Sequence, residues 1–353
     1  MSSFSTNRSG GRFRGPGVLE KVDETWKVAQ YILRFLVIIL LISLAACAGC
    51  PTPPKAVFII VDGVPPDVLE AVDTPVLDAI SAVGGYARAY VGGQPGGPTQ
   101  SPTISAVGYN SLLTGTWANK HNVWGNDIKA PNYAYWDIFR IAKNHDPELQ
   151  TAIFSTWLDN RTKLVGDGLP EAGGKKIDYA FDGFEVDEDR FPHDNNAHYI
   201  REIDELVSTE AGRYIVTEGP DLSWIYLEYT DDVGHSFGDS PQLVEAVKLM
   251  DVQIGRVWDA IRKREAETGE TWLIIITTDH GRDAETGKEH GGQTDRERAT
   301  WIVTNSTNLN DHFGDTTGVV DILPSIANHM GLSIPAAIEE QLDGMSFIDD
   351  QTY

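Results

Sequence analysis

The chain is poor in cysteine, in basic residues and in long apolar runs. Its only cysteines among 353 residues are Cys47 and Cys50, so the region after residue 50 can form no disulfide and offers no thiolate as metal ligand or nucleophile. Removing the six basic and three acidic residues of 1–50 leaves 22 basic and 49 acidic residues, a formal charge of −27. Because polyanion binding needs Lys and Arg, we expect no nucleic-acid binding.

One apolar segment near the N-terminus is short for a membrane span. Residues 1–30 are polar, and the apolar run within 31–50 covers the twelve residues 35–46, against about 20 for a spanning helix. This length is typical of a secretory signal, and LAAC ending at Cys47 resembles the lipobox of bacterial lipoproteins. An uncleaved signal anchor is the alternative. Both predict a location in the periplasm or at the cell surface, tethered to a membrane, with 51–55 as linker.

From residue 56 onward, strand-like and helix-like segments alternate. Apolar runs predict strands at 56–62, 86–91, 151–157, the start of 222–235, the start of 272–281, and 301–304. Amphipathic patterns predict helices at 65–84, 104–115, 198–211, 240–268 and 319–331. The polar, irregular stretch 158–195 reads as an insertion or cap. The alternation predicts one doubly wound α/β domain over 56–350, with a mostly parallel central sheet and helices on both faces.

Metal-type ligands follow the predicted strands where these end. They are Asp62, Asp231, His235, Asp279, His280 and His290. The carboxyl ends of parallel strands meet at one edge of a sheet, so these side chains should converge there. Three carboxylates and three imidazoles together suit a pair of divalent cations, which indicates phosphoryl-transfer chemistry.

Each motif also has a simpler interpretation. Asp231 and His235 lie four residues apart and could close on one cation in a turn, with Asp232 as a partner of a ligand; alone, the motif could be a polar turn. Asp279-His280 needs the strand to end before both side chains can reach one region, and the following glycine permits this. His290, taken by itself, would be a surface histidine.

A glycine- and hydroxyl-rich stretch at 96–115 offers the nucleophile. Ser101, Thr103 and Ser105 all lie near a predicted helix N-terminus, which favours anions. Two of the three should be caps or turn residues. A hydroxyl coordinated to a metal would lose its proton near neutral pH and become a nucleophile.

These motifs resemble the alkaline phosphatase superfamily, and most closely its type I phosphodiesterase/nucleotide pyrophosphatase family. The VDG strand end corresponds to a metal-ligating Asp62, and the DxxGH and DHG motifs correspond to the later ligands. The family nucleophile precedes a TG pair by nine residues, which falls on Ser105. The family asparagine, twenty-one residues further on, falls on Asn126 and would hold a phosphoryl oxygen. The likeness covers most of 56–348.

The resemblance implies two metal sites. One metal would take Asp231, His235 and His290. The other would take Asp62, Ser105, Asp279 and His280. Zinc suits mixed imidazole and carboxylate ligands, with manganese or iron as alternatives.

Three departures from the family pattern bear on specificity. Ser105 stands where this branch usually has threonine. His290 follows His280 by only ten positions, where nucleotide pyrophosphatases usually carry a long insertion. No cysteine follows Cys50 and no CxPxR-type segment is present, which disfavours sulfatase activity.

The sequence therefore predicts a two-metal hydrolase of small phosphate diesters or phosphoanhydrides that works through a phosphoseryl intermediate. A phosphomonoesterase is one alternative, with Arg161 and Arg282 as candidates to bind the extra phosphate charge. A phospho-group transferase acting on envelope glycolipids and a non-catalytic lipoprotein with the same scaffold are the others. Trp124 and Trp157 could stack on a substrate, although buried packing is the commoner use of tryptophan.

Overall fold

The computed structural model describes residues 53–314 and 316–349, together with Trp26, Gln30 and Arg34. The predicted signal or anchor segment, 31–50, lies outside the described residues apart from Arg34, as does Cys47. Among the helices of the described residues, none combines the length and the apolar character that a bilayer crossing requires.

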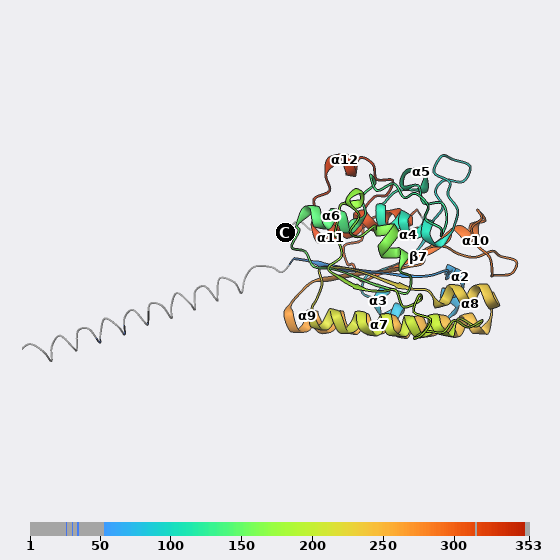
Figure 1. Ribbon diagram of the computed structural model, residues 1–353, viewed down its shortest axis with the longest axis horizontal. Helices are drawn as coiled ribbons and strands as arrows, with labels where there is room; N and C mark the ends of the chain where they lie inside the picture. The colour runs from blue at the N-terminus through green and yellow to red at the C-terminus, as the bar shows by residue number, and fades with distance from the viewer. Residues whose placement is uncertain (1–25, 27–29, 31–33, 35–52, 315, 350–353) are drawn as a thin grey trace, which may run out of the picture. The chain divides into compact units, whose positions relative to one another are not determined.

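A seven-stranded sheet in the order β2-β7-β6-β1-β5-β3-β4 forms the middle layer of the part that begins at residue 53 (Figure 1). Five neighbouring strands are parallel: β6 (Trp272–Thr277), β1 (Lys55–Val61), β5 (Leu222–Leu227), β3 (Thr151–Ser155) and β4 (Tyr179–Phe181). Two strands complete the sheet in antiparallel pairings: β7 (Ala299–Thr304) beside β6, and β2 (Gly85–Tyr90) beside β7. The predicted mostly parallel α/β sheet is confirmed.

Helices cover both faces of the sheet, as the alternation predicted. Alternate residues of β1 point to opposite faces. Ala56, Phe58 and Ile60 belong to one apolar core, and Val57 and Ile59 belong to another. The first core is covered by α4 (Ser105–Thr114), α6 (Ile138–His145) and α11 (Ile322–Met330). The second is covered by α3 (Pro75–Ser81), α7 (His198–Thr217) and α9 (Pro241–Thr268).

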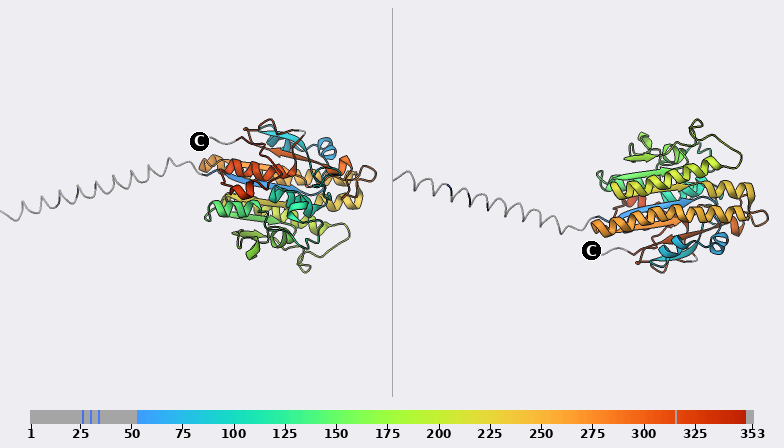
Figure 2. Two further views of the ribbon diagram at one scale, coloured as in Figure 1. Left: turned by 90° about the horizontal axis from the view of Figure 1, so that it is seen from above. Right: turned by 90° about the horizontal axis from the view of Figure 1, so that it is seen from below.

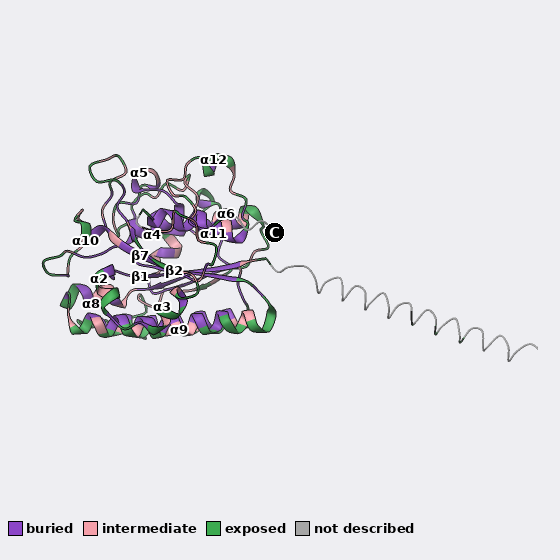
Figure 3. Ribbon diagram, turned by 180° about the vertical axis from the view of Figure 1, so that it is seen from behind, coloured by how far each residue is buried: buried purple, intermediate pink, exposed green. Residues whose placement is uncertain are grey.

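The two long helices α7 and α9 lie side by side across one face (Figure 2). They bury one side and expose the other, so this layer closes the core and faces solvent (Figure 3). The remaining helical segments are short: α2 (Pro66–Ala71), α5 (Ala118–His121), α8 (Tyr229–Phe237), α10 (Asp295–Arg298), α12 (Ala336–Glu339), a 3-10 turn at Val319–Asp321, and two segments within 158–195.

The helix predicted at 65–84 is divided in two. Pro75 cannot donate a backbone hydrogen bond, and it disfavours the helical conformation at Thr74, which has φ −127° and ψ 71°. The chain therefore leaves α2 at Ala71 and begins α3 at Pro75. The linker prediction also ran one residue too far, since β1 begins at Lys55.

The stretch 158–195 is more regular than its polar composition indicated. It contains a π-helical turn at Asn160–Val165, a 3-10 turn at Pro170–Ala172 and the strand β4. β4 pairs with β3 and forms one edge of the sheet. The short run Tyr179–Phe181 gives little alternation to recognise in sequence, so the strand was missed.

Candidate functional site

The carboxyl ends of β6, β1 and β5 bring the predicted ligands to one place. Asp62 follows β1 directly, and Asp279 comes two residues after the end of β6. The DDVGH motif lies in the helix α8, which begins just after β5, and not in the turn that we expected. Residues four apart on a helix share one face, so Asp231 and His235 still point the same way.

One group of ligands consists of Asp231, His235 and His290. His235 Nε2 lies 3.3 Å from Asp231 Oδ2 and 3.1 Å from His290 Nε2. His290 Nε2 is 4.0 Å from Asp231 Oδ1. Three residues that are up to 59 positions apart in the sequence thus lie beside one another, although the ligand atoms within 4.8 Å of each other are those of Asp231, His280 and His290 and do not include His235.

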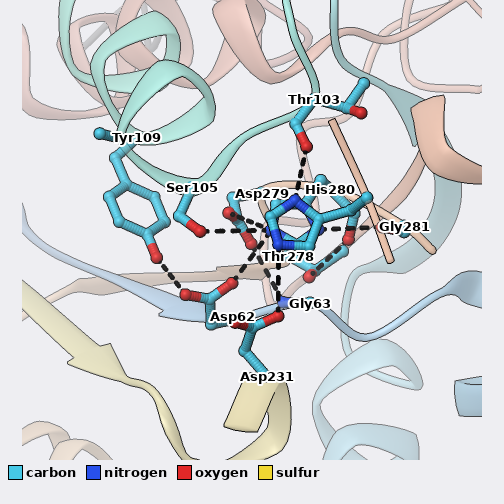
Figure 4. A network of polar contacts seen from close by, with 12 residues as sticks. Asp62, Gly63, Thr103, Ser105, Tyr109, Asp231, Thr278, Asp279, His280 and Gly281 are labelled. Carbon is cyan, nitrogen blue, oxygen red and sulfur yellow. Dashed lines mark hydrogen bonds and ion pairs between the residues drawn. The ribbon is translucent and has the colours of Figure 1, made fainter. Parts of the chain in front are cut away.

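The second group surrounds His280 (Figure 4). His280 Nε2 lies 3.4 Å from Asp62 Oδ1, 3.3 Å from Asp279 Oδ2 and 3.3 Å from Ser105 Oγ. The His280 and His290 rings stack with centroids 3.7 Å apart, which makes the two groups adjacent. His280 is also close enough to Asp231 and His290 to share a cation with them. Its contacts with Asp62, Asp279 and Ser105 are those expected for the second group.

Of the three candidate hydroxyls, Ser105 is the one in contact with the ligands. Ser105 is the first residue of α4 and is 5% exposed. The Thr103 hydroxyl instead accepts from the Gly291 amide at 3.0 Å and donates to the Gly292 carbonyl at 3.0 Å. The buried Ser101 hydroxyl has no hydrogen-bond partner in the described part of the chain.

Backbone carbonyls set the tautomers of two histidines. His290 Nδ1 lies 2.9 Å from the Thr103 carbonyl, and His280 Nδ1 lies 2.9 Å from the Gly281 carbonyl. A carbonyl only accepts, so Nδ1 carries the proton in both rings. Each Nε2 then presents a lone pair toward the site, as a metal ligand must.

Each of the three carboxylates is bound through one oxygen by the protein itself. Asp62 Oδ2 accepts from the Tyr109 and Tyr226 hydroxyls. Asp279 Oδ1 accepts from the Gly63 amide at 3.1 Å. The other oxygens, Asp62 Oδ1 and Asp279 Oδ2, are buried without a hydrogen-bond partner. A buried acceptor left unpaired is costly unless something else binds it.

Asp231 is paired with the buried guanidinium of Arg282. Arg282 binds Asp231 Oδ1 and, at 2.8 Å, the Asp231 carbonyl; it also donates to the carbonyls of Gly63 at 2.8 Å and Lys288 at 3.0 Å. With these donors occupied and no exposed surface, Arg282 does not fit its predicted role in binding a phosphate monoester. Arg161, the other candidate, is paired with Asp182.

Glycines make room for this arginine. A Cβ on Gly234 of α8 would lie 2.2 Å from Arg282 Cζ, and a Cβ on Gly63 would lie 2.6 Å from Arg282 Nη2. Both distances are far below van der Waals contact. The glycines of the VDG and DxxGH motifs are therefore required by Arg282 packing, and Gly63 also by its left-handed backbone at φ 65°.

The electrostatics of the cluster favour added positive charge. Burial and the negative charge of Asp231 raise the pKa of Asp62 to about 7. Burial, with the charges of Asp62 and Asp231, raises the pKa of Asp279 well above its usual range. Burial also lowers the pKa of His280 well below its ordinary value, which keeps the ring neutral. Unpaired carboxylate oxygens and neutral imidazoles form a donor set that fits divalent cations.

Asn126 lies in the loop after α5 and reaches the start of α4. Its Oδ1 accepts from the Ala106 amide at 3.0 Å, and the side chain is otherwise exposed. The Nδ2 group of Asn126 donates to no protein acceptor among the described residues. It therefore sits next to Ser105 with its donor hydrogens free.

Sequence reasoning missed Tyr109 and Tyr226 as neighbours of the predicted ligands, and it named Thr103 only as a candidate hydroxyl and not as a partner of His290. Tyr109 had one available signal, because it lies one helical turn after Ser105 and so shares its face of α4. Tyr226 and Thr103 act through contacts with residues more than 160 positions away, which no local pattern shows.

A family model described as type I phosphodiesterase/nucleotide pyrophosphatase matches residues 56–328. The chain belongs to this family. Family membership makes the protein a phosphoric ester hydrolase. The matched range includes the sheet, the helix α4 and both groups of predicted ligands.

A curated relative, the 2,3-bisphosphoglycerate-independent phosphoglycerate mutase of Rhodopseudomonas palustris, is 30% identical over 148 residues. The match covers 40% of this chain and 25% of the relative. The chain thus spans about a quarter of that mutase, and the mutase activity is not carried over.

Solved structures share the fold at low sequence identity. The phosphonate monoester hydrolase of Agrobacterium radiobacter has TM-score 0.56 and 14% identity, covering 85% of this chain and 78% of that one. Murine ectonucleotide pyrophosphatase/phosphodiesterase 5, as an inactive variant with AMP, has TM-score 0.54 and 13% identity, covering 80% and 96%. A putative sulfatase from Bacteroides thetaiotaomicron has TM-score 0.57 and 14% identity, covering 84% and 74%. These likenesses establish the alkaline phosphatase-like fold alone.

Proposed function

We propose that this family member hydrolyses phosphate diesters or phosphoanhydrides with two divalent cations and Ser105 as nucleophile. The observation that carries the proposal is the meeting of Ser105 Oγ with two adjacent groups of lone-pair donors. Asp231, His235 and His290 would hold one cation. Asp62, Asp279, His280 and Ser105 would hold the other.

Zinc is the cation that the donors favour. Each group offers three side-chain ligands besides Ser105, and each carboxylate has one oxygen already bound by the protein, so few ligands are available. Catalytic zinc typically has three protein ligands and one open position. Manganese or iron is the alternative. Bound here, two such cations would lower the pKa of the Ser105 hydroxyl and neutralise charge on the phosphoryl oxygens.

The chain's own residues then account for two displacement steps. In the first, a bond forms between Ser105 Oγ and phosphorus as the bond to the leaving oxygen breaks; the serine proton is lost to solvent, and the phosphorylated serine keeps the second ester group of a diester substrate. In the second, a water oxygen bonds to phosphorus and the bond to Ser105 Oγ breaks. Asn126 uses Nδ2 to bind a phosphoryl oxygen, since its Oδ1 is fixed by the Ala106 amide.

Replacement of the nucleophile tests this proposal. Ser105→Ala in the metal-loaded protein should lower hydrolysis of bis(p-nitrophenyl) phosphate by about 10³-fold or more, with metal content per chain largely retained. Ser101→Ala is the matched control and should keep its activity. Mass spectrometry of wild type rapidly quenched during turnover of this diester should find a p-nitrophenyl phosphoryl group on Ser105. Loss of activity in Ser101→Ala with Ser105→Ala unaffected would contradict the assignment.

Metal dependence is tested by removal and return. Treatment with EDTA should abolish turnover, and zinc or manganese should restore it. The ratio of rates on p-nitrophenyl phosphate and on the diester separates the monoesterase alternative. The occupied donors of Arg282 and the Arg161–Asp182 pair weaken that alternative, because neither arginine is free for a dianionic phosphate.

The location outside the cytoplasm and the membrane tether also belong to the proposal. Their support is the apolar run in 31–50 and the LAAC sequence ending at Cys47. Mass spectrometry of the membrane-bound protein would test lipidation, since only the lipoprotein should begin at Cys47 and carry a lipid on that thiol, and Cys47→Ser should abolish both. A transferase on envelope lipids would reveal itself by moving phosphate to a lipid acceptor in preference to water.

A further inference from the structure

We infer that Tyr109 and Tyr226 are positioning residues that limit Asp62 to a single free oxygen and thereby set which cation its site prefers. The inference rests on the proposed metal site, and it concerns two residues that the sequence motifs do not include. It follows from the hydrogen bonds, the burial and the position of the two tyrosines.

The two hydroxyls occupy one oxygen of Asp62. The Tyr226 hydroxyl lies 2.7 Å from Asp62 Oδ2, and the Tyr109 hydroxyl binds the same atom. A carboxylate oxygen has two lone pairs in its plane, and each phenol has one proton to donate. With both protons donated to Oδ2, the 2.9 Å contact between the two hydroxyls carries no hydrogen bond, and the two donors fill the acceptor capacity of Oδ2. No lone pair of that atom remains for a cation.

The other oxygen of Asp62 faces the ligands. Asp62 Oδ1 is buried, has no hydrogen-bond partner in the described chain, and lies 3.4 Å from His280 Nε2. The carboxylate is thus fixed with one oxygen toward the tyrosines and the other toward His280, as Figure 4 shows for Tyr109. It can bind a cation through one atom only.

The tyrosines are held rigidly. Tyr109 and Tyr226 are 0% and 2% exposed, their hydroxyls are 2.9 Å apart, and their rings meet edge to face. Tyr109 belongs to α4 one turn after Ser105, and Tyr226 belongs to β5. The pair therefore ties the nucleophile helix, β5 and the ligand after β1 to one another.

A freed second oxygen would change the coordination that the site can offer. Zinc in protein sites typically takes few ligands, whereas manganese accepts more oxygen donors. With Oδ2 free, Asp62 could bind through both oxygens. The site would then lose its bias toward the smaller coordination number, and loss of hydrogen bonds to a ligand typically weakens metal affinity by about 10- to 100-fold.

The test is metal titration of the full chain with Tyr109→Phe, Tyr226→Phe and the double change, which remove only hydroxyl groups. Apoprotein is titrated with Zn²⁺ and Mn²⁺ against a chromophoric chelator. Zinc affinity at one site should fall by about 10- to 100-fold in the double variant, while manganese affinity falls less. Tyr179→Phe is the control. The Tyr179 hydroxyl donates to Glu210 at 2.6 Å and contacts none of the predicted ligands, so its removal should leave both metal affinities unchanged.

Equal losses for both cations, or no change in either, would overturn the inference and assign the tyrosines a packing role. Thermal unfolding of the apoproteins separates a packing role from misfolding, because each phenylalanine variant should still unfold in one cooperative transition, as the Tyr179→Phe control does. A wild type that binds neither cation would refute the metal site itself. The two failures are distinguishable. If the wild type binds metal and the tyrosine variants bind it equally well, only the tyrosine inference fails; if the wild type binds no metal, the metal site fails.

Discussion

A single methyl group added at Gly234 should displace Arg282 and so disrupt the orientation of Asp231. The glycine lies within α8, between Asp231 and His235, and its hypothetical Cβ falls 2.2 Å from Arg282 Cζ and 2.3 Å from Nε. The guanidinium cannot stay where it is in Gly234→Ala. Its bonds to Asp231 and to the Gly63 and Lys288 carbonyls must then break or distort.

The expected cost follows from two opposing effects. Alanine in place of a helix-interior glycine stabilises by about 0.5–1 kcal/mol. Breaking a buried ion pair costs about 3–5 kcal/mol. The net loss in the free energy of unfolding should be about 2–4 kcal/mol, or a melting temperature lower by about 3–6 °C for a domain of this size. Asp231 would also lose its fixed orientation, so metal-dependent hydrolysis should fall with stability.

Gly255→Ala is the matched control for this experiment. Gly255 lies inside α9, and a Cβ there would meet Val76 Cγ2 at 3.2 Å, a contact that a small shift relieves. Urea unfolding of both variants without metal, followed by diester hydrolysis with zinc, gives the comparison. The control should remain within about 1 kcal/mol of the wild type. If Gly234→Ala behaves like Gly255→Ala in both assays, the argument that Arg282 organises Asp231 is refuted.

Three further predictions concern the loop that carries Asn126. Burial lowers the pKa of His121 from 6.5 to about 3, and its Nδ1 accepts from the Val123 amide at 3.1 Å. Because the unfolded chain binds this proton more readily, the contribution of His121 to stability is present above about pH 6.5 and is lost as the pH falls; between pH 6.5 and 4 the loss should be about 3 kcal/mol. In His121→Gln, the free energy of unfolding measured in urea should fall by about 3 kcal/mol less than in the wild type over the same pH range. Asn126→Asp keeps the acceptor for the Ala106 amide but loses the donor, so kcat for the diester should fall by about 10²- to 10³-fold while the melting temperature changes little. Trp124 is 46% exposed and lines the same pocket as Asn126, so Trp124→Ala should raise KM for p-nitrophenyl esters and not for methyl esters.

Each of these has a clear contrary result. An unchanged pH dependence in His121→Gln would mean that another group causes the acid sensitivity. Full activity in Asn126→Asp would remove Asn126 from phosphoryl binding. An equal rise in KM for aryl and methyl esters after Trp124→Ala would assign the indole to loop structure, where its Nε1 already donates to Asn122 at 3.0 Å.

The sequence predicted the elements that obey local rules. The apolar run ending in Asp62 is β1, and the helix stop at Gly115 is a left-handed residue with φ 61°. Because parallel strands end at one edge, the positions after β1 and β6 and in α8 could be brought together without a structure. The meeting of the six predicted ligands follows from that rule.

What the sequence could not predict depends on contacts between distant segments. Arg282 looked like a free cation after the DHG motif, yet it is enclosed by Gly63, Asp231 and Lys288. Tyr226 looked like any residue of an apolar strand, yet its hydroxyl binds Asp62. Propensity and spacing describe the neighbours of a residue in the chain. Arg282 and Asp231 lie 51 positions apart, and Tyr226 and Asp62 lie 164 positions apart.

The bonds of Thr103 to the segment after His290 have a consequence for how this enzyme can vary. Thr103 lies two residues before Ser105. Its hydroxyl accepts from the Gly291 amide and donates to the Gly292 carbonyl, and its own carbonyl orients the His290 ring. The hydrogen bonds of Thr103 therefore couple the position of residues 101–103 to that of residues 290–293. Among related sequences, we expect changes in length or residue type at 291–293 to be accompanied by changes at 101–103, and neither stretch to drift alone.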